Sequence, residues 1–235
     1  MRLAFPHRIF LSLMVFTTTI MNAQTDTNKH LDARQQSMVV IAALTATGDV
    51  ENLKIQLNFG LDSGLTVNEI KEMLVQLYAY CGFPRSLNAI NSFKAVLDER
   101  KTKDIDDAQG KEIMTNNDDA DKYEQGRQVL ETLTGMPQPK PAPGFGEFAP
   151  RIDAFLKEHL FADIFASNVL TYQQRELITI SALAAMTGVV PQLQAHLAMG
   201  KHTGLTNTEL LQAADLIEKH INKTQADILR RNLPN

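Results

Sequence analysis

Two residues that can transfer protons lie in the second half of the chain, Glu176 and His196. Imidazole titrates near neutral pH, so a histidine held beside a carboxylate can accept and return a proton. A lone histidine on an apolar helix face also occurs as a hydrogen-bonded core residue, and a glutamate in the first turn of a helix complements the helix dipole. If the fold brings both side chains together, the pair predicts acid–base catalysis.

The first half offers a thiol and a cation. Cys81 is the single cysteine, which excludes an internal disulfide and any reaction that cycles one. It precedes a helix expected to begin near Pro84, where a thiol can have a lowered pKa, but a free cysteine also fits a small buried apolar side chain. The planar guanidinium of Arg85 can bind a carboxylate with two hydrogen bonds, although a surface role fits equally well. Cys81 is therefore a third catalytic candidate, and Arg85 is a substrate-binding candidate.

The segments that must position these residues occur twice. Residues 31–77 are echoed by residues 170–217, about 140 residues later, which is far beyond the period of a solenoid or propeller. The best-matched positions pair Gly60 with Gly200, Gly64 with Gly204, and Glu69 with Glu209. The chain therefore contains two copies of one unit, and chemically useful residues are distributed unequally between them.

Apolar residues recur at helical spacing, and no segment alternates long enough to predict a strand, so we expect an all-α fold. Residues 37–47 and 176–186 are apolar nearly all round, as in helices buried on most sides. Thr66 with Glu69 and Thr206 with Glu209 form capping-box patterns that begin a third helix in each copy. The other expected helices span residues 50–61, 84–99, 120–133, 152–165 and 191–201.

Composition shifts suggest the domain boundaries. Residues 101–121 are polar and acidic, and residues 135–150 are rich in proline and glycine, so both segments are expected to be irregular connectors. The predicted organisation is a signal peptide, a first unit, a linker with one helix, and a second unit, over residues 1–23, 24–100, 101–150 and 151–235.

The N-terminus has the pattern of an export signal. Two arginines precede an apolar run over residues 9–20, and Ala23 follows at a suitable cleavage position. The run is short for a membrane span, so we expect a periplasmic or secreted protein without a stable membrane anchor; a retained N-terminal anchor is the alternative. Cleavage removes two of 23 basic residues and none of 27 acidic ones, which moves the net charge from −4 to −6. An acidic chain without a basic stripe is not expected to bind nucleic acid.

The ordered features of both copies resemble the carboxymuconolactone decarboxylase family, which includes the alkylhydroperoxidase D-type proteins. The resemblance rests on Glu176 opening an apolar helix, His196, the Gly204–Thr206 turn with Glu209, and residues 80–84 (Tyr-Cys-Gly-Phe-Pro). It implies two tandem helical units and assembly into a ring-like homo-oligomer, with a trimer as the natural expectation. Alkylhydroperoxidase-type members use two cysteines ahead of the histidine, and those positions hold Val189 and Gln192 here.

The resemblance further implies the chemistry. The decarboxylase branch keeps the histidine, lacks the cysteine pair, and needs no metal or organic cofactor. We therefore expect a cofactor-independent lyase of decarboxylase type that uses Glu176 and His196 on a small carboxylate or lactone. The alternatives are a peroxiredoxin-like oxidoreductase working through Cys81 alone and a non-catalytic helical binding protein. No metal site is expected, because His202 and His220 have no ligand-spaced partners.

The copies also differ after the third helix. Residues 80–84 form the Tyr-x-Gly-x-Pro element in the first copy, whereas residues 219–223 (Lys-His-Ile-Asn-Lys) occupy that place in the second. The first copy holds Ser37 and Gln56 where the second holds Glu176 and His196. We therefore expect one acid–imidazole site, with the first copy supplying walls and a thiol.

Overall fold

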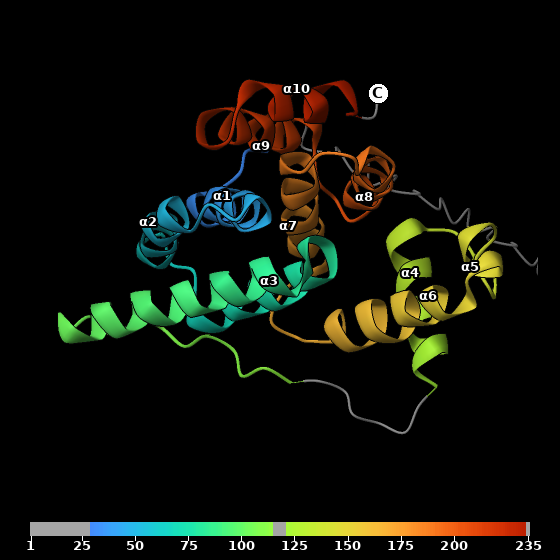
Figure 1. The fold of residues 1–235 in the computed structure, drawn as a ribbon, viewed down its shortest axis with the longest axis horizontal. Coiled ribbons are helices and arrows are strands. Elements are labelled where there is room, and N and C mark those ends of the chain that lie inside the picture. The colour runs from blue at the N-terminus through green and yellow to red at the C-terminus, as the bar shows by residue number, and fades with distance from the viewer. Residues whose placement is uncertain (1–28, 115–120, 234–235) are drawn as a thin grey trace, which may run out of the picture.

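The structure, a computed structural model, describes residues 29–114 and 121–233, so the expected signal peptide lies outside the described residues. The described part is helical without strands, which confirms the all-α prediction. None of its helices is long and apolar enough to cross a bilayer. The elements are α1 (Ala33–Thr47), α2 (Val50–Asp62), α3 (Val67–Thr102), α4 (Lys122–Thr134), α5 (Phe145–Phe148), α6 (Pro150–Ala154), η1 (Phe155–Ile164), α7 (Tyr172–Ala185), α8 (Val190–His202), α9 (Asn207–His220) and α10 (Lys223–Arg231), as Figure 1 shows.

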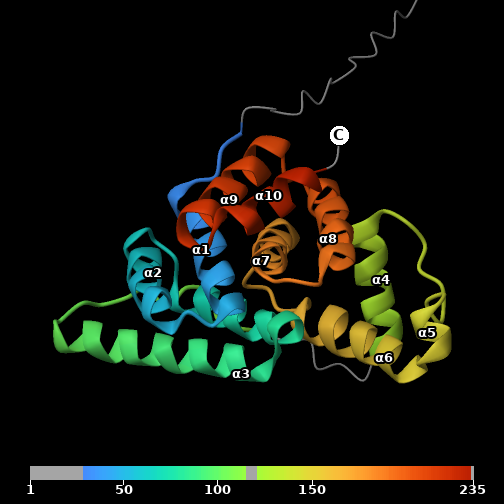
Figure 2. The same cartoon turned by 45° about the horizontal axis from the view of Figure 1, so that its top comes forward.

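The first helices of the two units, α1 and α7, pack against each other at the centre (Figure 2). All residues from Ser37 to Ala46 and from Arg175 to Ala185 are buried, as their all-round apolar sequence predicts. In both views α3 lies on one side of this central pair, and α9 with α10 lies on the other. The two units therefore share one core.

The third helix of each unit crosses to its neighbour, because α3 packs on α7 and α9 packs on α1. The Gln76 side chain of α3 donates hydrogen bonds to the Thr179 hydroxyl (2.9 Å) and to the Arg175 carbonyl (3.0 Å). Arg175 in turn donates to Oε1 of Gln76 at 2.8 Å. Any site that the hairpin of one unit forms is consequently completed by the third helix of the other unit.

The expected helix starts are confirmed. Thr66 and Thr206 are N-caps whose hydroxyls accept the backbone N–H of Glu69 and Glu209, and both glutamates return a bond to the cap. The preceding Gly64 has a φ of 92°, a left-handed conformation that a side chain would strain. These local signals place both third helices.

A helix break occurs at the same point in both units, and it corrects the alignment of residues 80–84 with the second unit. Helix α3 is broken at Gly82 (φ 81°, ψ 159°), and the equivalent break in the second unit is Asn222, the N-cap of α10. The sequence comparison set Lys219 opposite Tyr80, but the breaks place His220 opposite Tyr80. The capped turns already carry an offset of 140 residues at this point, since Glu69 matches Glu209.

The connector forms a helical layer of its own, in which α4 packs closely on η1. A Cβ atom at Gly126 would lie 1.8 Å from the carbonyl oxygen of Lys157, so this approach requires glycine. The expected α-helix over residues 152–165 is instead a short α6 followed by a π-helix, with Phe165 N–H bonding the Leu160 carbonyl at 3.1 Å. The wider turn changes which side chains face inward: Phe155 is exposed, whereas Lys157 is buried.

Both predicted connectors are fastened at specific points. Asp107 accepts a hydrogen bond from Nη2 of Arg100 at 2.9 Å, and the Ala108 carbonyl accepts the N–H of Val67 at 2.9 Å. The proline-rich segment was expected to be irregular, but it contains the one-turn helix α5, so the linker has two helices rather than one. Lys157 holds this segment through the Pro139 carbonyl at 3.0 Å.

Candidate functional site between the two units

A glycine lets α8 approach α7 closely enough for Glu176 and His196 to meet. A Cβ atom at Gly200 would lie 2.8 Å from Cδ1 of Ile180 and 3.0 Å from Cδ1 of Leu205, so a larger residue would push the helices apart. One turn earlier on α8, Nδ1 of His196 lies 2.7 Å from Oε2 of Glu176. The two predicted residues therefore form a direct hydrogen bond.

The pair is shielded from solvent. The Glu176 side chain is fully buried, and 9% of the His196 side chain is exposed. With a proton on Nδ1, the imidazole donates to the carboxylate, which fixes the ring and stabilises a positive charge on it. Nε2 makes no hydrogen bond to any described residue and is thus the nitrogen available to a substrate.

Tyr80, from α3 of the first unit, completes the cluster. Its ring meets the His196 ring edge-on, with centroids 5.3 Å apart and planes at 78°. Burial and the Glu176 charge raise the pKa of Tyr80, so its hydroxyl keeps its proton at neutral pH and can act as a donor. Thr179 lies nearby and partly opposes this shift, but no hydrogen bond of normal geometry joins the two hydroxyls.

Two polar atoms beside the pair are buried without a partner in the described part of the chain: the Tyr80 hydroxyl and Oε1 of Glu176. Buried polar atoms in folded proteins are nearly always hydrogen-bonded, so these two atoms retain unused hydrogen-bonding capacity. A donor and an acceptor thus flank the imidazole.

The neighbouring Arg175 is committed to packing. Its side chain is fully buried, donates to Gln76 and to the Ser167 carbonyl, and lies 3.5 Å from Oε2 of Glu72. Burial lowers the pKa of Arg175, and the Glu72 charge opposes that shift. The guanidinium therefore joins the two units beneath the pair.

Cys81 has the surroundings of a packed apolar residue. Its sulfur donates to the Leu77 carbonyl at 3.1 Å, and the side chain packs partly buried against the core. Burial raises the pKa of the Cys81 thiol, and the nearby Arg85 offsets this only in part. The thiol is thus protonated at neutral pH, which makes it a weak nucleophile.

Arg85 lies away from the acid–imidazole pair. It is exposed, and its Nη1 lies 3.7 Å from the sulfur of Met186, the residue that follows α7. Met186 is ten residues beyond Glu176, which corresponds to about 15 Å along the helix axis. The structure does not bring the predicted substrate clamp into the cluster.

Sequence reasoning missed the contribution of α3 to this cluster. Tyr80 was noted within its motif but given no role, and Gln76 was not singled out. Their spacing of four residues places both on one face of a helix, which is the available signal. Which helix that face meets depends on the crossing of α3 to α7.

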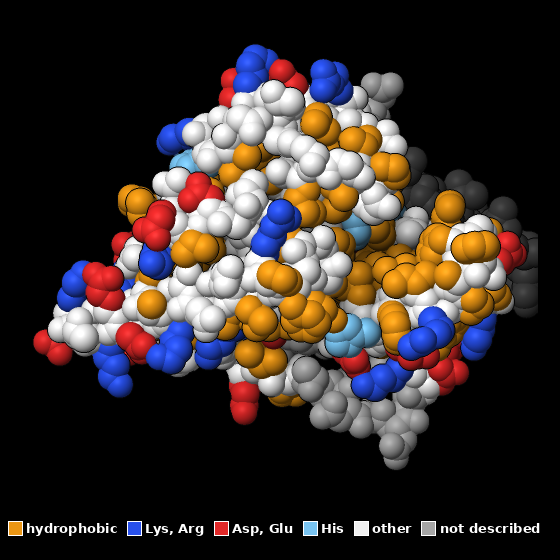
Figure 3. Space-filling view, in the orientation of Figure 1, with side chains coloured by type: hydrophobic (Ala, Val, Ile, Leu, Met, Phe, Trp, Pro, Cys, Tyr) orange, Lys and Arg blue, Asp and Glu red, His pale blue; other side chains and the backbone are white. Residues whose placement is uncertain are grey.

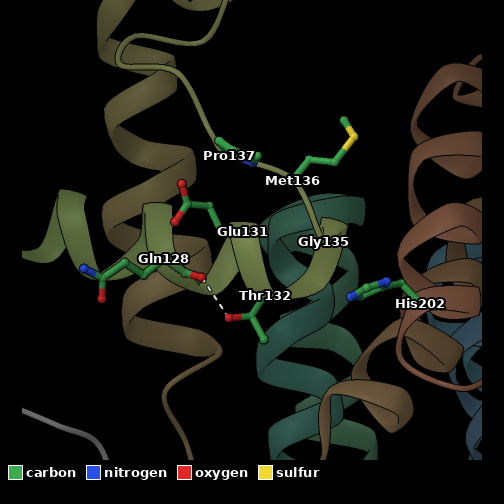
Figure 4. Close-up of a pocket in the computed structure, with 7 residues that line it drawn as sticks. All are labelled: Gln128, Glu131, Thr132, Gly135, Met136, Pro137 and His202. Atoms are coloured by element: carbon green, nitrogen blue, oxygen red, sulfur yellow. Dashed lines mark hydrogen bonds between the residues drawn. The ribbon is translucent and has the colours of Figure 1, made fainter.

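A hollow of about 490 Å³ lies outside this cluster, between the end of α4 and His202 of α8 (Figure 4). Glu131 on its wall is already held by Arg127 and by the backbone N–H of Gln138. His202 is exposed and has no acidic partner among the described residues. Over residues 29–114 and 121–233, no group of three or more histidine, cysteine or acidic side chains could hold a metal ion.

The comparisons with known proteins agree with this architecture. The model of the "Carboxymuconolactone decarboxylase family" matches residues 13–95 and 150–218, more than half of the chain and one region in each unit. The chain belongs to the carboxymuconolactone decarboxylase family. Its match in two regions confirms a tandem carboxymuconolactone decarboxylase-like protein made of two related helical units.

A curated protein is similar to part of this chain. An uncharacterized protein of Methanocaldococcus jannaschii is 28% identical over 83 residues, which cover 34% of this chain and 78% of that protein. The similarity thus covers about a third of this chain and most of that protein.

Proposed function

We propose that this protein is a cofactor-independent enzyme of lyase or decarboxylase type, acting on a small carboxylate or lactone. Its proton-transfer residues are Glu176 and His196, and Tyr80 donates a hydrogen bond to the substrate. The observation that carries the proposal is the 2.7 Å bond between Nδ1 of His196 and Oε2 of Glu176, which leaves Nε2 unbonded within the described residues. Family membership supports the same class of chemistry.

In the proposed cycle, Nε2 of His196 takes up a proton from solvent, and Glu176 stabilises the resulting imidazolium beside the substrate carboxylate. Loss of carbon dioxide breaks a carbon–carbon bond and leaves its electron pair on the substrate carbon. The imidazolium then gives its proton to that carbon, which restores the neutral ring. Tyr80 can donate its hydroxyl proton in a hydrogen bond to the oxygen where negative charge gathers.

The oxidoreductase alternative depends on a thiolate at Cys81. Burial raises the pKa of this thiol, and its hydrogen is donated to the Leu77 carbonyl. Both features lower the thiolate population that a peroxide would need. The acid–imidazole reading is therefore preferred.

Because the substrate is unknown, the test screens several small compounds for hydrogen exchange catalysed by the protein. Small lactones and unsaturated carboxylic acids are incubated with the enzyme in D2O, and NMR records deuterium entry and carbon dioxide release. His196→Gln and Glu176→Gln should slow both reactions by about 10²- to 10⁴-fold. His202→Gln, on the same helix but outside the cluster, is the matched control. Equal rates in His196→Gln and the unaltered protein would refute the role of the pair.

We also propose that the protein is exported and self-associates. Residues 1–23 are proposed to be removed as a signal peptide, so that the protein acts in the periplasm or outside the cell as a homo-oligomer, with a trimer as the first candidate. The intact mass of protein recovered from the periplasm or medium tests cleavage. A mass that includes residues 1–23 would contradict it.

A further inference from the structure

A hollow of about 290 Å³ lies at the position that the repeat relates to the acid–imidazole site. Ser37 of α1, Gln56 of α2 and His220 of α9 line it, and they are the counterparts of Glu176, His196 and Tyr80. The same exchange of third helices that builds the first cluster therefore builds this hollow. Its volume is just below the range of about 300–1,000 Å³ for small-molecule sites, so it suits a small ligand.

The hollow is open because no helix of the described connector packs on Phe59, as the connector helices do on Met199 in the second unit. In the second unit, Met199 packs into the connector layer with Leu133 and Phe161 and is 5% exposed. Its counterpart, Phe59, lines the hollow and is 56% exposed. The connector thus covers Met199 on α8, whereas Phe59 on α2 is uncovered and the hollow beside it is accessible to a ligand.

Donors without partners face this hollow. Lys219 forms no ion pair with any described residue, and the Gln56 side chain makes no hydrogen bond in that part of the chain. Among the described residues, no aspartate or glutamate lines the hollow. Burial lowers the pKa of His220, and the Lys219 charge lowers it further. His220 is therefore uncharged at neutral pH, and Lys219 is the one charged side chain among the described residues that line the hollow, with no protein anion there to balance it.

The rest of the lining is apolar, with Val40, Phe59 and Leu216 among its residues. A ligand that complements both the polar donors and the apolar lining has a single anionic group and a short apolar body. We propose that the hollow between α1, α2 and α9 is a second binding site, which takes small monocarboxylates through Lys219, His220 and Gln56. It has no carboxylate to orient a general base, so it binds without catalysing. This proposal is independent of the function proposed for Glu176 and His196.

Benzoate is a suitable probe, with benzamide as its uncharged counterpart of the same shape. Isothermal titration of the unaltered protein should show saturable binding of benzoate, with benzamide binding at least about tenfold more weakly. Added salt should weaken benzoate binding, because Lys219 is exposed to solvent. Equal affinities for the two probes would overturn the proposal, and so would an absence of saturable binding.

The location of binding can be tested by fluorescence, because the chain contains no tryptophan. In Phe59→Trp the single indole lies on the wall of the hollow, so benzoate should change its emission with the affinity that titration gives. Adding Lys219→Gln should weaken binding at least about tenfold. Lys94→Gln removes the same charge from an exposed position of α3 and should leave the affinity unchanged.

The His196→Gln variant separates the two sites. Benzoate binding that survives His196→Gln but is weakened by Lys219→Gln supports the second site, whatever the outcome for catalysis. Binding that is lost in His196→Gln and unchanged in Lys219→Gln places the anion at the acid–imidazole pair and overturns this proposal.

Discussion

At the scale of residues, the two positions related by the repeat carry different side chains: a buried acid–imidazole pair at one and an open hollow at the other. Glu176 and His196 form one short hydrogen bond, whereas Ser37 and Gln56 occupy the same places without an acid or a base. Ser37 instead donates to the Ala33 carbonyl of its own helix at 3.0 Å. The backbone repeats, but a histidine hydrogen-bonded to a carboxylate is found at only one of these two positions.

Tyr80→Phe tests whether the unpartnered hydroxyl serves the reaction or the fold. Because the buried hydroxyl has no hydrogen-bond partner in the described chain, its removal should change the free energy of unfolding by no more than about 1 kcal/mol. The deuterium-exchange rate should fall, since a donor to the substrate is lost. Urea unfolding and NMR measure the two effects, with Tyr78→Phe as the control. A stability loss above about 2 kcal/mol with unchanged exchange would assign Tyr80 a structural role.

At the scale of elements, close approaches of helices decide where side chains lie. Gly200 brings α8 onto α7, and Gly126 brings α4 onto η1. The second contact is the tighter one, because a Cβ atom would meet backbone rather than a flexible side chain. Each glycine fixes the position of a whole helix.

Gly126→Ala should separate α4 from η1 and loosen the connector layer. Overpacking of this kind costs about 1–3 kcal/mol and exceeds the gain of about 1 kcal/mol that alanine brings to a helix. Urea unfolding should show the loss, whereas Gln128→Ala on the exposed face of α4 should be neutral. A Gly126→Ala protein as stable as the unaltered one would show that the layer can shift freely.

The connector also contains a buried ion pair, in which Nζ of Lys157 lies 2.9 Å from Oδ1 of Asp153. Burial alone raises the pKa of Asp153, but the hydrogen bond from Tyr123 and the contact with Lys157 outweigh it, and the net shift is downward. A carboxylate with a lowered pKa stabilises the fold above its ordinary pKa of 3.8, and the effect is lost as the pH falls through the lowered value.

Asp153→Asn should therefore destabilise the protein at pH 7, by about 3–5 kcal/mol if Lys157 is left unpaired. The difference from the unaltered protein should shrink as the pH falls below 3.8 and through the lowered pKa of Asp153, where Asp153 itself becomes protonated. Urea unfolding at several pH values measures this, and Asp98→Asn, which breaks the exposed pair with Lys94, should cost less than about 1 kcal/mol. A difference that is constant with pH would show that the charge of Asp153 does not contribute.

At the scale of the whole molecule, one face is unusually apolar. Figure 3 shows hydrophobic side chains gathered over the connector helices α5 and α6. They include Phe145, Phe148, Ile152 and Phe155, which are 53%, 92%, 52% and 54% exposed. A patch of this kind favours association, in agreement with the proposed homo-oligomer.

Phe148→Asp should weaken that association. Burying one phenylalanine contributes about 1.5–3 kcal/mol, so its loss should raise the dissociation constant at least about tenfold. Light scattering over a range of concentrations should show an oligomer for the unaltered protein and a shift toward the mass of one chain for Phe148→Asp. Leu211→Asp, at an exposed leucine of α9, is the control. A monomer at micromolar concentration before any substitution would contradict the proposed assembly.

The sequence by itself determined the helical elements of this protein and offered the two members of its buried acid–imidazole pair as candidates. Helical periodicity, capping boxes and turn glycines are local, so they placed both third helices and the central α1 and α7 correctly. The resemblance to the family pattern singled out Glu176 and His196 as candidates. Tertiary structure alone decided that Tyr80 completes the pair and that Arg85 does not, because both depend on α3 crossing to the other unit. The widened turn of η1 and the open hollow beside His220 likewise arise from packing between segments far apart in the chain, which no local pattern encodes.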